Sequence, residues 1–168
     1  MSFLAILAIH EQLDELFLLH QEALLQLDLA LAAARLREFE RELRMHMQVE
    51  EELLLPVYRR AGRVPGGPPE FFTGEHQRLL ALLARIAESL ERLTPGQPGL
   101  HREIIRLFDA GAAFKSLMEH HDQRERNLFF PKLDQLTDES ERATLLAACR
   151  ARQDWDRRTA QPVPGAKA

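Results

Sequence analysis

The chain has 168 residues and a mass of 19.3 kDa, the size of a single domain with a sizeable hydrophobic core. It contains 26 Asp and Glu against 22 Lys and Arg, and the net charge of −4 argues against a nucleic-acid-binding protein, which would carry a basic face. Valine, isoleucine and threonine together number only 14, too few for a β-rich fold, so the composition predicts an all-α protein.

Neither a disulfide nor a membrane span is expected. Cys149 is the only cysteine, which excludes an internal disulfide and favours a reducing compartment. No run approaches the roughly 20 apolar residues of a transmembrane helix. The apolar run that begins at Phe3 has no basic segment before it, unlike a signal peptide. We therefore expect a cytoplasmic protein without a membrane partner.

Clusters of proline and glycine divide the chain into helices. One cluster occupies residues 62–69, a second occupies 94–99, and Asp28 is a candidate N-cap at a further break. The stretches between them carry apolar residues at the three- and four-residue spacing of amphipathic helices. Short connections between long helices predict an up-down-up-down antiparallel four-helix bundle with a short fifth helix. The predicted helices span residues 2–26, 29–60, 70–93, 100–130 and 137 to about 155, within a bundle domain over 1–155 that a flexible tail over 156–168 follows.

The apolar stripe of every long helix is interrupted by a histidine, and two of the stripes also contain a glutamate. One constant shift along the chain superimposes the first long helix on the third and matches His10 with His76. A slightly longer shift superimposes the second long helix on the fourth. The chain therefore resembles two copies of one helical hairpin, each with a histidine followed by a His-x-x-x-Glu motif. The residues that match at the longer shift are His46 and His121, Glu50 and Glu125, and Pro56 and Pro131.

The two His-x-x-x-Glu motifs predict a metal site. A four-residue step keeps both side chains of a motif on one helix face, about 6 Å apart along the helix axis. Because both motifs lie within apolar stripes, their side chains are expected in the bundle core. Two carboxylates there would repel each other and carry a large desolvation penalty unless a cation lay between them. Imidazole and carboxylate suit iron, manganese or zinc, so we expect one or two divalent metal ions.

Distance from the first turn indicates which histidine of the first helix joins the site. His10 and His46 lie equally far from Asp28 along the chain, one before it and one after it, so an antiparallel hairpin places them side by side. His20 lies about 15 Å nearer the turn and would be the ligand only if that turn were nearer residue 33. We interpret His20 as a histidine of the core.

The same argument pairs the histidines of the second hairpin. His76 and His121 lie at nearly equal distances along the chain from Gln97, in the middle of the second loop, and are expected to meet. Several acidic residues flank the motifs and either face solvent or accept an N–H bond from an imidazole. These residues are Glu51, Glu52, Glu119 and Asp122.

At these positions the sequence resembles the hemerythrin-like family, also called the HHE cation-binding domain. The resemblance covers about residues 5–133 and rests on the single histidines and the two His-x-x-x-Glu motifs with their following prolines. Family members carry a non-haem di-iron centre bridged by two carboxylates. The resemblance implies two iron ions bridged by Glu50 and Glu125, with terminal ligands His10, His46, His76 and His121.

Two positions differ from the oxygen-carrying hemerythrins. Those proteins have a second histidine four residues after the ligand on the third helix, where this chain has Leu80. They also have an aspartate five residues after the histidine of the fourth helix, whereas Glu125 follows His121 by four. The chain therefore looks like the symmetric HHE branch, with two histidines for each metal.

The functional expectation follows from the open coordination positions of such a centre, which would bind O2, NO or peroxide. Leu54 and Phe129, about one turn beyond each glutamate, would form an apolar floor that admits a small ligand and limits water. We expect a binding protein in sensing, iron or redox homeostasis, or stress response. A di-iron oxidase or peroxidase and a metal-poor helical interaction module stay open, as do a homodimer and any signalling partner. Binding is favoured over catalysis because no acid–base pair outside the metal site supports an organic substrate.

Overall fold

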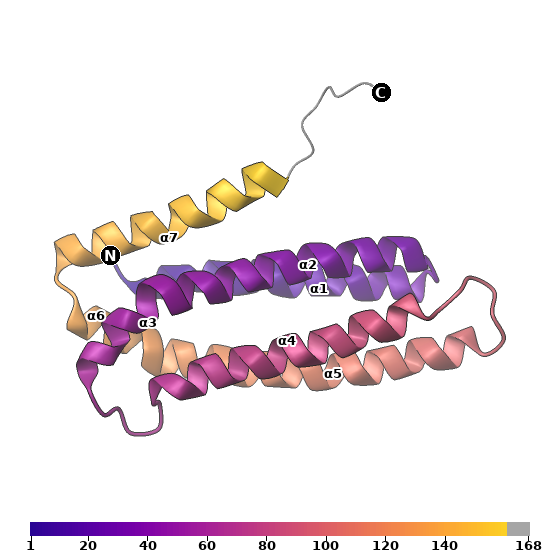
Figure 1. The fold of residues 1–168 in the computed structure, drawn as a ribbon, viewed down its shortest axis with the longest axis horizontal. Helices are drawn as coiled ribbons and strands as arrows, with labels where there is room; N and C mark the ends of the chain where they lie inside the picture. Colours follow the sequence, from indigo (N-terminus) through magenta and orange to yellow (C-terminus); the bar gives the residue numbers. More distant parts are fainter. Residues whose placement is uncertain (161–168) are drawn as a thin grey trace.

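The structure is a computed structural model that describes the chain over residues 1–160 and its side chains over residues 1–152. Four long helices lie side by side, and a further helix packs outside them (Figure 1). Over residues 1–160 the chain forms helices, turns and loops and no β-strand, which confirms the predicted all-α fold. The four long helices are α1 (Ala8–Leu25), α2 (Leu29–Val49), α4 (Pro69–Glu91) and α5 (Leu100–Arg124).

The four long helices form a closed square. The α1–α2 and α4–α5 hairpins pack internally, and the two hairpins meet where α2 contacts α4 and α1 contacts α5. Each hairpin therefore supplies two of the four helices of the bundle, as the internal repeat predicts.

Shorter segments extend the bundle at the end away from the α1–α2 turn. A 3-10 turn precedes α1, while α2 and α5 each continue through a π-helical turn into a further helix. Two helices predicted as continuous, over 29–60 and 100–130, are therefore interrupted. In chain order the segments are η1 (Phe3–Leu7), η2 (Glu50–Leu54, π), α3 (Leu55–Tyr58), η3 (Arg59–Ala61), η4 (Glu125–Phe129, π) and α6 (Phe130–Leu136).

The last helix, α7 (Glu139–Ala160), packs against α2 on the outside of the bundle (Figure 1). It runs past the predicted end near residue 155, because no proline or glycine follows Thr137 until Pro162. The rest of the predicted tail, 161–168, lies outside the described residues.

The turn between α1 and α2 forms where Asp28 predicted it. The Asp28 side chain caps α2 by accepting a hydrogen bond from the Leu31 N–H at 2.9 Å. Leu27 closes α1 in the left-handed region at φ 57°, and Asp28 N–H donates to the carbonyl of Ala23, the pattern of a Schellman motif. A leucine rather than a glycine takes this conformation because its side chain packs against the core.

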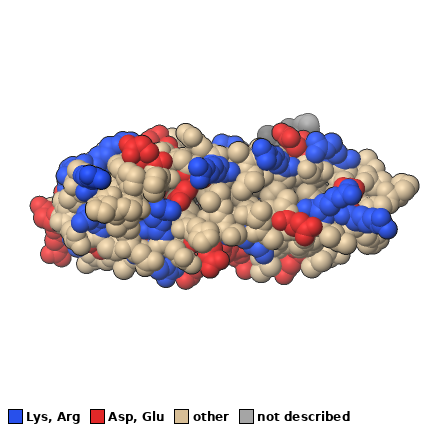
Figure 2. All heavy atoms as spheres, turned by 90° about the horizontal axis from the view of Figure 1, so that it is seen from below, with Lys and Arg blue, Asp and Glu red and all other residues tan. Residues whose placement is uncertain are grey.

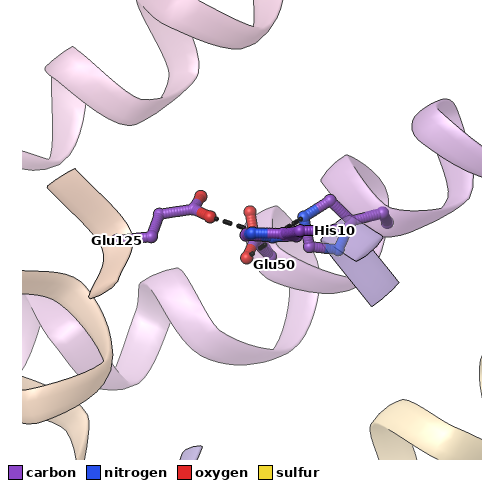
Figure 3. Close-up of side chains that lie close together, drawn as sticks. His10, Glu50 and Glu125 are labelled. Atoms are coloured by element: carbon purple, nitrogen blue, oxygen red, sulfur yellow. Dashed lines mark hydrogen bonds and ion pairs between the residues drawn. The ribbon is translucent and has the colours of Figure 1, made fainter. Parts of the chain in front are cut away.

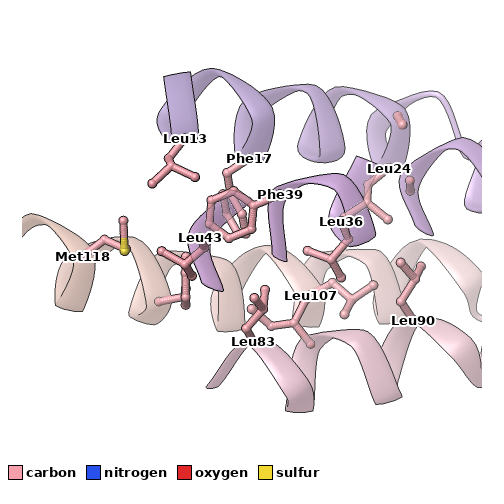
Figure 4. Packing of buried hydrophobic residues seen from close by; sticks show 14 of the residues in the cluster. Leu13, Phe17, Leu24, Leu36, Phe39, Leu43, Leu83, Leu90, Leu107 and Met118 are labelled. Atoms are coloured by element: carbon pink, nitrogen blue, oxygen red, sulfur yellow. The ribbon is translucent and has the colours of Figure 1, made fainter. Parts of the chain in front are cut away.

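Two hydrophobic clusters fill the bundle. The larger one occupies the part of the bundle that includes the α1–α2 turn and contains Phe17, Phe39 and Phe114, whose ring centroids lie 5.1–5.6 Å apart. Figure 4 shows part of this cluster, with Phe17 and Phe39 near its middle. The smaller one lies at the other end and includes Tyr58 and Phe129. On each long helix the predicted site residues lie between these two clusters in the sequence.

On the face shown in Figure 2, Lys and Arg are interspersed with Asp and Glu, and neither sign of charge dominates. No helix within the described residues is long and apolar enough to cross a membrane.

Candidate metal centre

The six predicted ligand residues converge at one level of the bundle, between the two hydrophobic clusters. They come from all four corners of the bundle, and each is at most 3% exposed. Their donor atoms form two groups, each with all ligand atoms within 4.8 Å of one another. The two groups share both glutamates. One contains His10, His46, Glu50 and Glu125, and the other contains His76, His121, Glu50 and Glu125.

The Glu50 carboxylate lies between the two histidine pairs. Its Oε1 is 3.6 Å from His46 Nε2, and its Oε2 is 3.4 Å from His76 Nε2. One oxygen therefore faces each pair, which is the orientation required of a carboxylate that bridges two metal ions.

The Glu125 carboxylate has the same arrangement from the opposite corner. Its Oε2 is 3.3 Å from His10 Nε2, and its Oε1 is 2.8 Å from His121 Nε2. Figure 3 shows Glu125 directed toward His10 and Glu50 across the core. The two carboxylates therefore reproduce, in three dimensions, the pseudo-symmetry of the two sequence motifs.

The carboxylate oxygens of this cluster lie within ion-pair distance of the imidazoles, but no hydrogen bond of good geometry satisfies them. Both oxygens of Glu50, both oxygens of Glu125 and the Nε2 atoms of His76 and His121 make no hydrogen bond. Buried polar groups are normally satisfied, because leaving one unpaired costs about 1–3 kcal/mol. Nitrogen and carboxylate donors that converge without partners fit a divalent cation. The residues present therefore suit a metal centre.

The protonation states show how unfavourable the cluster is without a cation. Burial and the Glu50 carboxylate raise the pKa of Glu125 well above its ordinary value. Burial also opposes ionisation of Glu50, yet the imidazoles of His46 and His76 outweigh it and hold the Glu50 pKa below its ordinary range. Burial, followed by His46, lowers the pKa of His10 to about 3, so this imidazole stays neutral and keeps a lone pair for a metal.

Each glutamate opens a π-helical turn. Leu55 N–H donates to the Glu50 carbonyl and Phe130 N–H to the Glu125 carbonyl, five residues back in both cases. The matched prolines explain the turns: Pro56 and Pro131 have no N–H and their rings would clash with a carbonyl four residues earlier in a regular α-helix. The π-turns absorb that clash at the residues that carry the carboxylates.

Flanking carboxylates orient the rings of one histidine pair. His76 Nδ1 lies 2.7 Å from Glu51 Oε1, and His121 Nδ1 lies 3.1 Å from Glu75 Oε2. Asp122 Oδ1 lies 3.2 Å from His10 Nδ1, and burial raises the Asp122 pKa to about 7. The predicted role of Glu51 next to an imidazole is thus supported by geometry, whereas Asp122 lies near His10 without completing a hydrogen bond.

Glu52 and Glu119, which flank the motifs in the same way, face other partners. Glu52 interacts with Gln48 and Arg152, and Glu119 accepts a hydrogen bond from Gln123. These contacts lie away from the histidines of the site. Glu52 and Glu119 are exposed, which matches the alternative that the sequence left open, a solvated helix face.

Glu75 was not predicted. It precedes His76 in the chain, is only 8% exposed, and reaches across from α4 to His121 on α5. The available signal in the sequence was an acidic residue next to a candidate ligand. The sequence does not identify the partner of Glu75, because that partner depends on how α4 packs on α5.

His20 is a core histidine, as its level predicted. Its Nδ1 lies 2.8 Å from the carbonyl oxygen of Ala32, and its ring packs near Phe17. It belongs to neither group of converging donor atoms.

Leu54 and Phe129 are fully buried at the end of the site nearer α3 and α6. Phe129 packs against the rings of Tyr58 and Phe72 at 5.0 and 4.7 Å between centroids. The Tyr58 hydroxyl donates to the Gly67 carbonyl at 2.8 Å, so this tyrosine is engaged in packing and loop closure. Leu54 and Phe129 are therefore buried members of the smaller hydrophobic cluster.

The comparison with known protein families agrees with this geometry. The family model described as Hemerythrin HHE cation binding domain matches residues 4–92 and 67–161, and the two matches overlap in α4. No curated protein and no solved structure matches the chain. Together the two matches span nearly all of the chain, so this protein belongs to the hemerythrin HHE cation-binding domain family.

Proposed function

We propose that the chain holds a non-haem di-iron centre in which Glu50 and Glu125 bridge the two iron ions. In this proposal His10 and His46 bind one ion, and His76 and His121 bind the other. The supporting observation is that each buried carboxylate directs one oxygen toward each histidine pair and that none of the four oxygens has a hydrogen-bond partner. Manganese or zinc would fit the same donors.

The ligand count leaves room for a small molecule. Each ion would receive two imidazole nitrogens and two carboxylate oxygens from the protein, fewer than the six donors of an octahedral site. Bound iron would supply open coordination positions for O2, NO or peroxide. Leu54 and Phe129 would exclude water from that position and so favour a small neutral ligand.

We infer that the protein binds or senses such a ligand rather than turning over an organic substrate. Within the described residues, both groups of potential ligand atoms belong to this one cluster, so the chemistry that the residues support is centred on a metal rather than on an organic substrate. A role in sensing, in iron or redox homeostasis, or in the response to oxidative or nitrosative stress is consistent with this chemistry. The alternative function, in which the centre consumes its oxidant catalytically, is that of a di-iron oxidase or peroxidase.

The experiment that tests this function compares adduct formation with turnover. Apoprotein is loaded anaerobically with Fe(II), and O2, NO or peroxide is added while the absorption spectrum and the consumption of the oxidant are followed. We expect a stable absorbing adduct that saturates at a stoichiometric amount of ligand. Continuous consumption of oxidant would instead assign the protein as an oxidase or peroxidase.

Two glutamate variants on the same helical segment provide the control. Glu125→Ala removes a proposed bridge and should abolish the adduct. Glu119→Ala removes an exposed carboxylate that accepts a hydrogen bond from Gln123 and should leave the adduct intact. Equal spectra for the two variants would contradict the proposed role of Glu125.

A further inference from the structure

The two proposed metal positions have different surroundings beyond their direct ligands. At the position of His76 and His121, both Nδ1 atoms face carboxylates, Glu51 at 2.7 Å and Glu75 at 3.1 Å. A carboxylate at Nδ1 keeps the proton on that nitrogen, directs the Nε2 lone pair at the metal and makes the imidazole a better donor.

Glu75 is itself held in place. Its other oxygen lies 2.9 Å from Arg124 Nη2, and the Arg124 guanidinium also donates to the Gly66 carbonyl at 3.2 Å and stands 5.1 Å over the Phe71 ring. The orientation of His121 is therefore fixed by a chain of contacts that reaches the loop before α4.

The position of His10 and His46 lacks such support. His46 Nδ1 is buried and makes no hydrogen bond. His10 Nδ1 is 3.2 Å from Asp122 Oδ1, but neither atom completes a hydrogen bond with acceptable geometry. The two rings contact each other through their Nε2 atoms at 3.0 Å, but neither Nδ1 atom has a hydrogen-bond partner that would fix the orientation of its ring.

This pair also lies nearer to a surface cleft. A cleft of about 600 Å³ opens between α1 and α5 and is lined by Phe17, Met118 and Asp122. Because Asp122 contacts His10, one side chain separates the cleft from the candidate ligand.

We propose that the two metal positions are inequivalent: the His76–His121 position retains its ion, and the His10–His46 position exchanges its ion through the cleft between α1 and α5. The inference rests on the proposed di-iron function and adds Glu51 and Glu75 as positioning residues. Removing a carboxylate that supports a metal-bound histidine typically weakens binding by about 10–100-fold.

The test measures release of Fe(II) from the loaded protein to an excess of a chromogenic chelator under anaerobic conditions. We expect two phases of equal amplitude, each about one iron per chain, with rate constants that differ by at least about tenfold. Glu51→Gln and Glu75→Gln should each accelerate the slow phase by about 10–100-fold and leave the fast phase unchanged. Asp122→Asn serves as the matched control and should leave the slow phase unchanged.

A cleft-filling variant tests the exchange route. Leu18→Trp enlarges an exposed side chain that lines the cleft and should slow the fast phase alone. Release of two irons in a single phase, or equal acceleration of both phases by Glu51→Gln, would overturn the inequivalence while leaving the di-iron proposal standing. A wild-type chain that takes up no iron would overturn the proposed function itself. Because the Glu51 side chain is 43% exposed, its variant remains informative if Glu75→Gln does not fold.

Discussion

Helix α1 buries two histidines whose surroundings differ. His10 is 3% exposed and places Nε2 3.0 Å from His46 Nε2 and 3.3 Å from Glu125, whereas His20 is 1% exposed and pairs with a backbone carbonyl. We expect His10→Ala to lower the iron content from about two ions per chain to about one, since one of the two donor groups loses a ligand. Elemental analysis of the purified variant measures this.

His20→Ala is the matched control on the same helix. It removes a buried hydrogen bond to the Ala32 carbonyl and opens a small cavity, so we expect a loss of about 2 kcal/mol in the free energy of unfolding. The iron content should stay at the wild-type value. Loss of iron in the His20 variant, together with full iron in the His10 variant, would reverse our assignment of the two histidines.

Cys149 is predicted to be unreactive in the folded protein. Burial, followed by the Glu50 carboxylate, raises the pKa of its thiol from 9.0 to about 11. Because the folded-state pKa is raised, the folded protein favours the neutral thiol; this stabilisation is complete below about pH 9 and is lost as the pH rises through about 11. Alkylation at pH 8 should be much slower in native than in denatured protein. Rapid labelling of native protein at pH 8 would contradict the buried position.

The metal site shows which side-chain positions a sequence can predict. Helical periodicity places His46 and Glu50 on one face because their separation is local, and symmetry about Asp28 pairs His10 with His46. Neither helical periodicity nor hairpin symmetry predicts the role of Glu75. It lies one residue from His76, about 100° around α4, and meets His121 only because α4 packs on α5.

Helix boundaries were predictable where the chain contains strong local signals. Asp28 and the loops over 62–69 and 94–99 end or begin helices in the structure, as proline, glycine and capping preferences require. The π-turns at Glu50 and Glu125 were not predicted, although both prolines were visible. A proline in a helical pattern indicates a break or kink, and the type of distortion depends on what the surrounding helices demand.

Arg142 anchors α7 to the bundle. Its guanidinium donates to the backbone carbonyls of Met1, Asp134 and Thr137 at 2.9, 2.6 and 2.9 Å. Loss of these charge-assisted hydrogen bonds in Arg142→Ala should cost about 2 kcal/mol in the free energy of unfolding and loosen the start of α7.

Urea denaturation and limited proteolysis measure the two effects of that substitution. Arg102→Ala, at an exposed position on α5, should change stability by less than about 0.5 kcal/mol. Iron content should be unchanged in both variants, because neither residue contacts the site. Equal stability of the two variants would show that Arg142 does not hold α7.

The bundle as a whole buries its polar centre between two apolar clusters, where an unpaired charge is costly. A ligand that binds only the folded state stabilises it by about 2.7 kcal/mol when its concentration is about 100 times its Kd. For a chain of this size, removal of iron should therefore lower Tm by about 5–10 °C. Calorimetry before and after chelation measures the shift, and an unchanged Tm would mean that the cluster is satisfied without metal.

The most direct test of the di-iron assignment is the metal content of protein purified without chelators or metal-affinity resin. Mass spectrometry should find about two iron ions per chain in the wild type, one for each group of donor atoms. Glu50→Ala should retain little or no iron, because Glu50 belongs to both groups. A wild-type chain without stoichiometric metal even after anaerobic loading with Fe(II), or a Glu50→Ala variant with unchanged iron, would contradict the account.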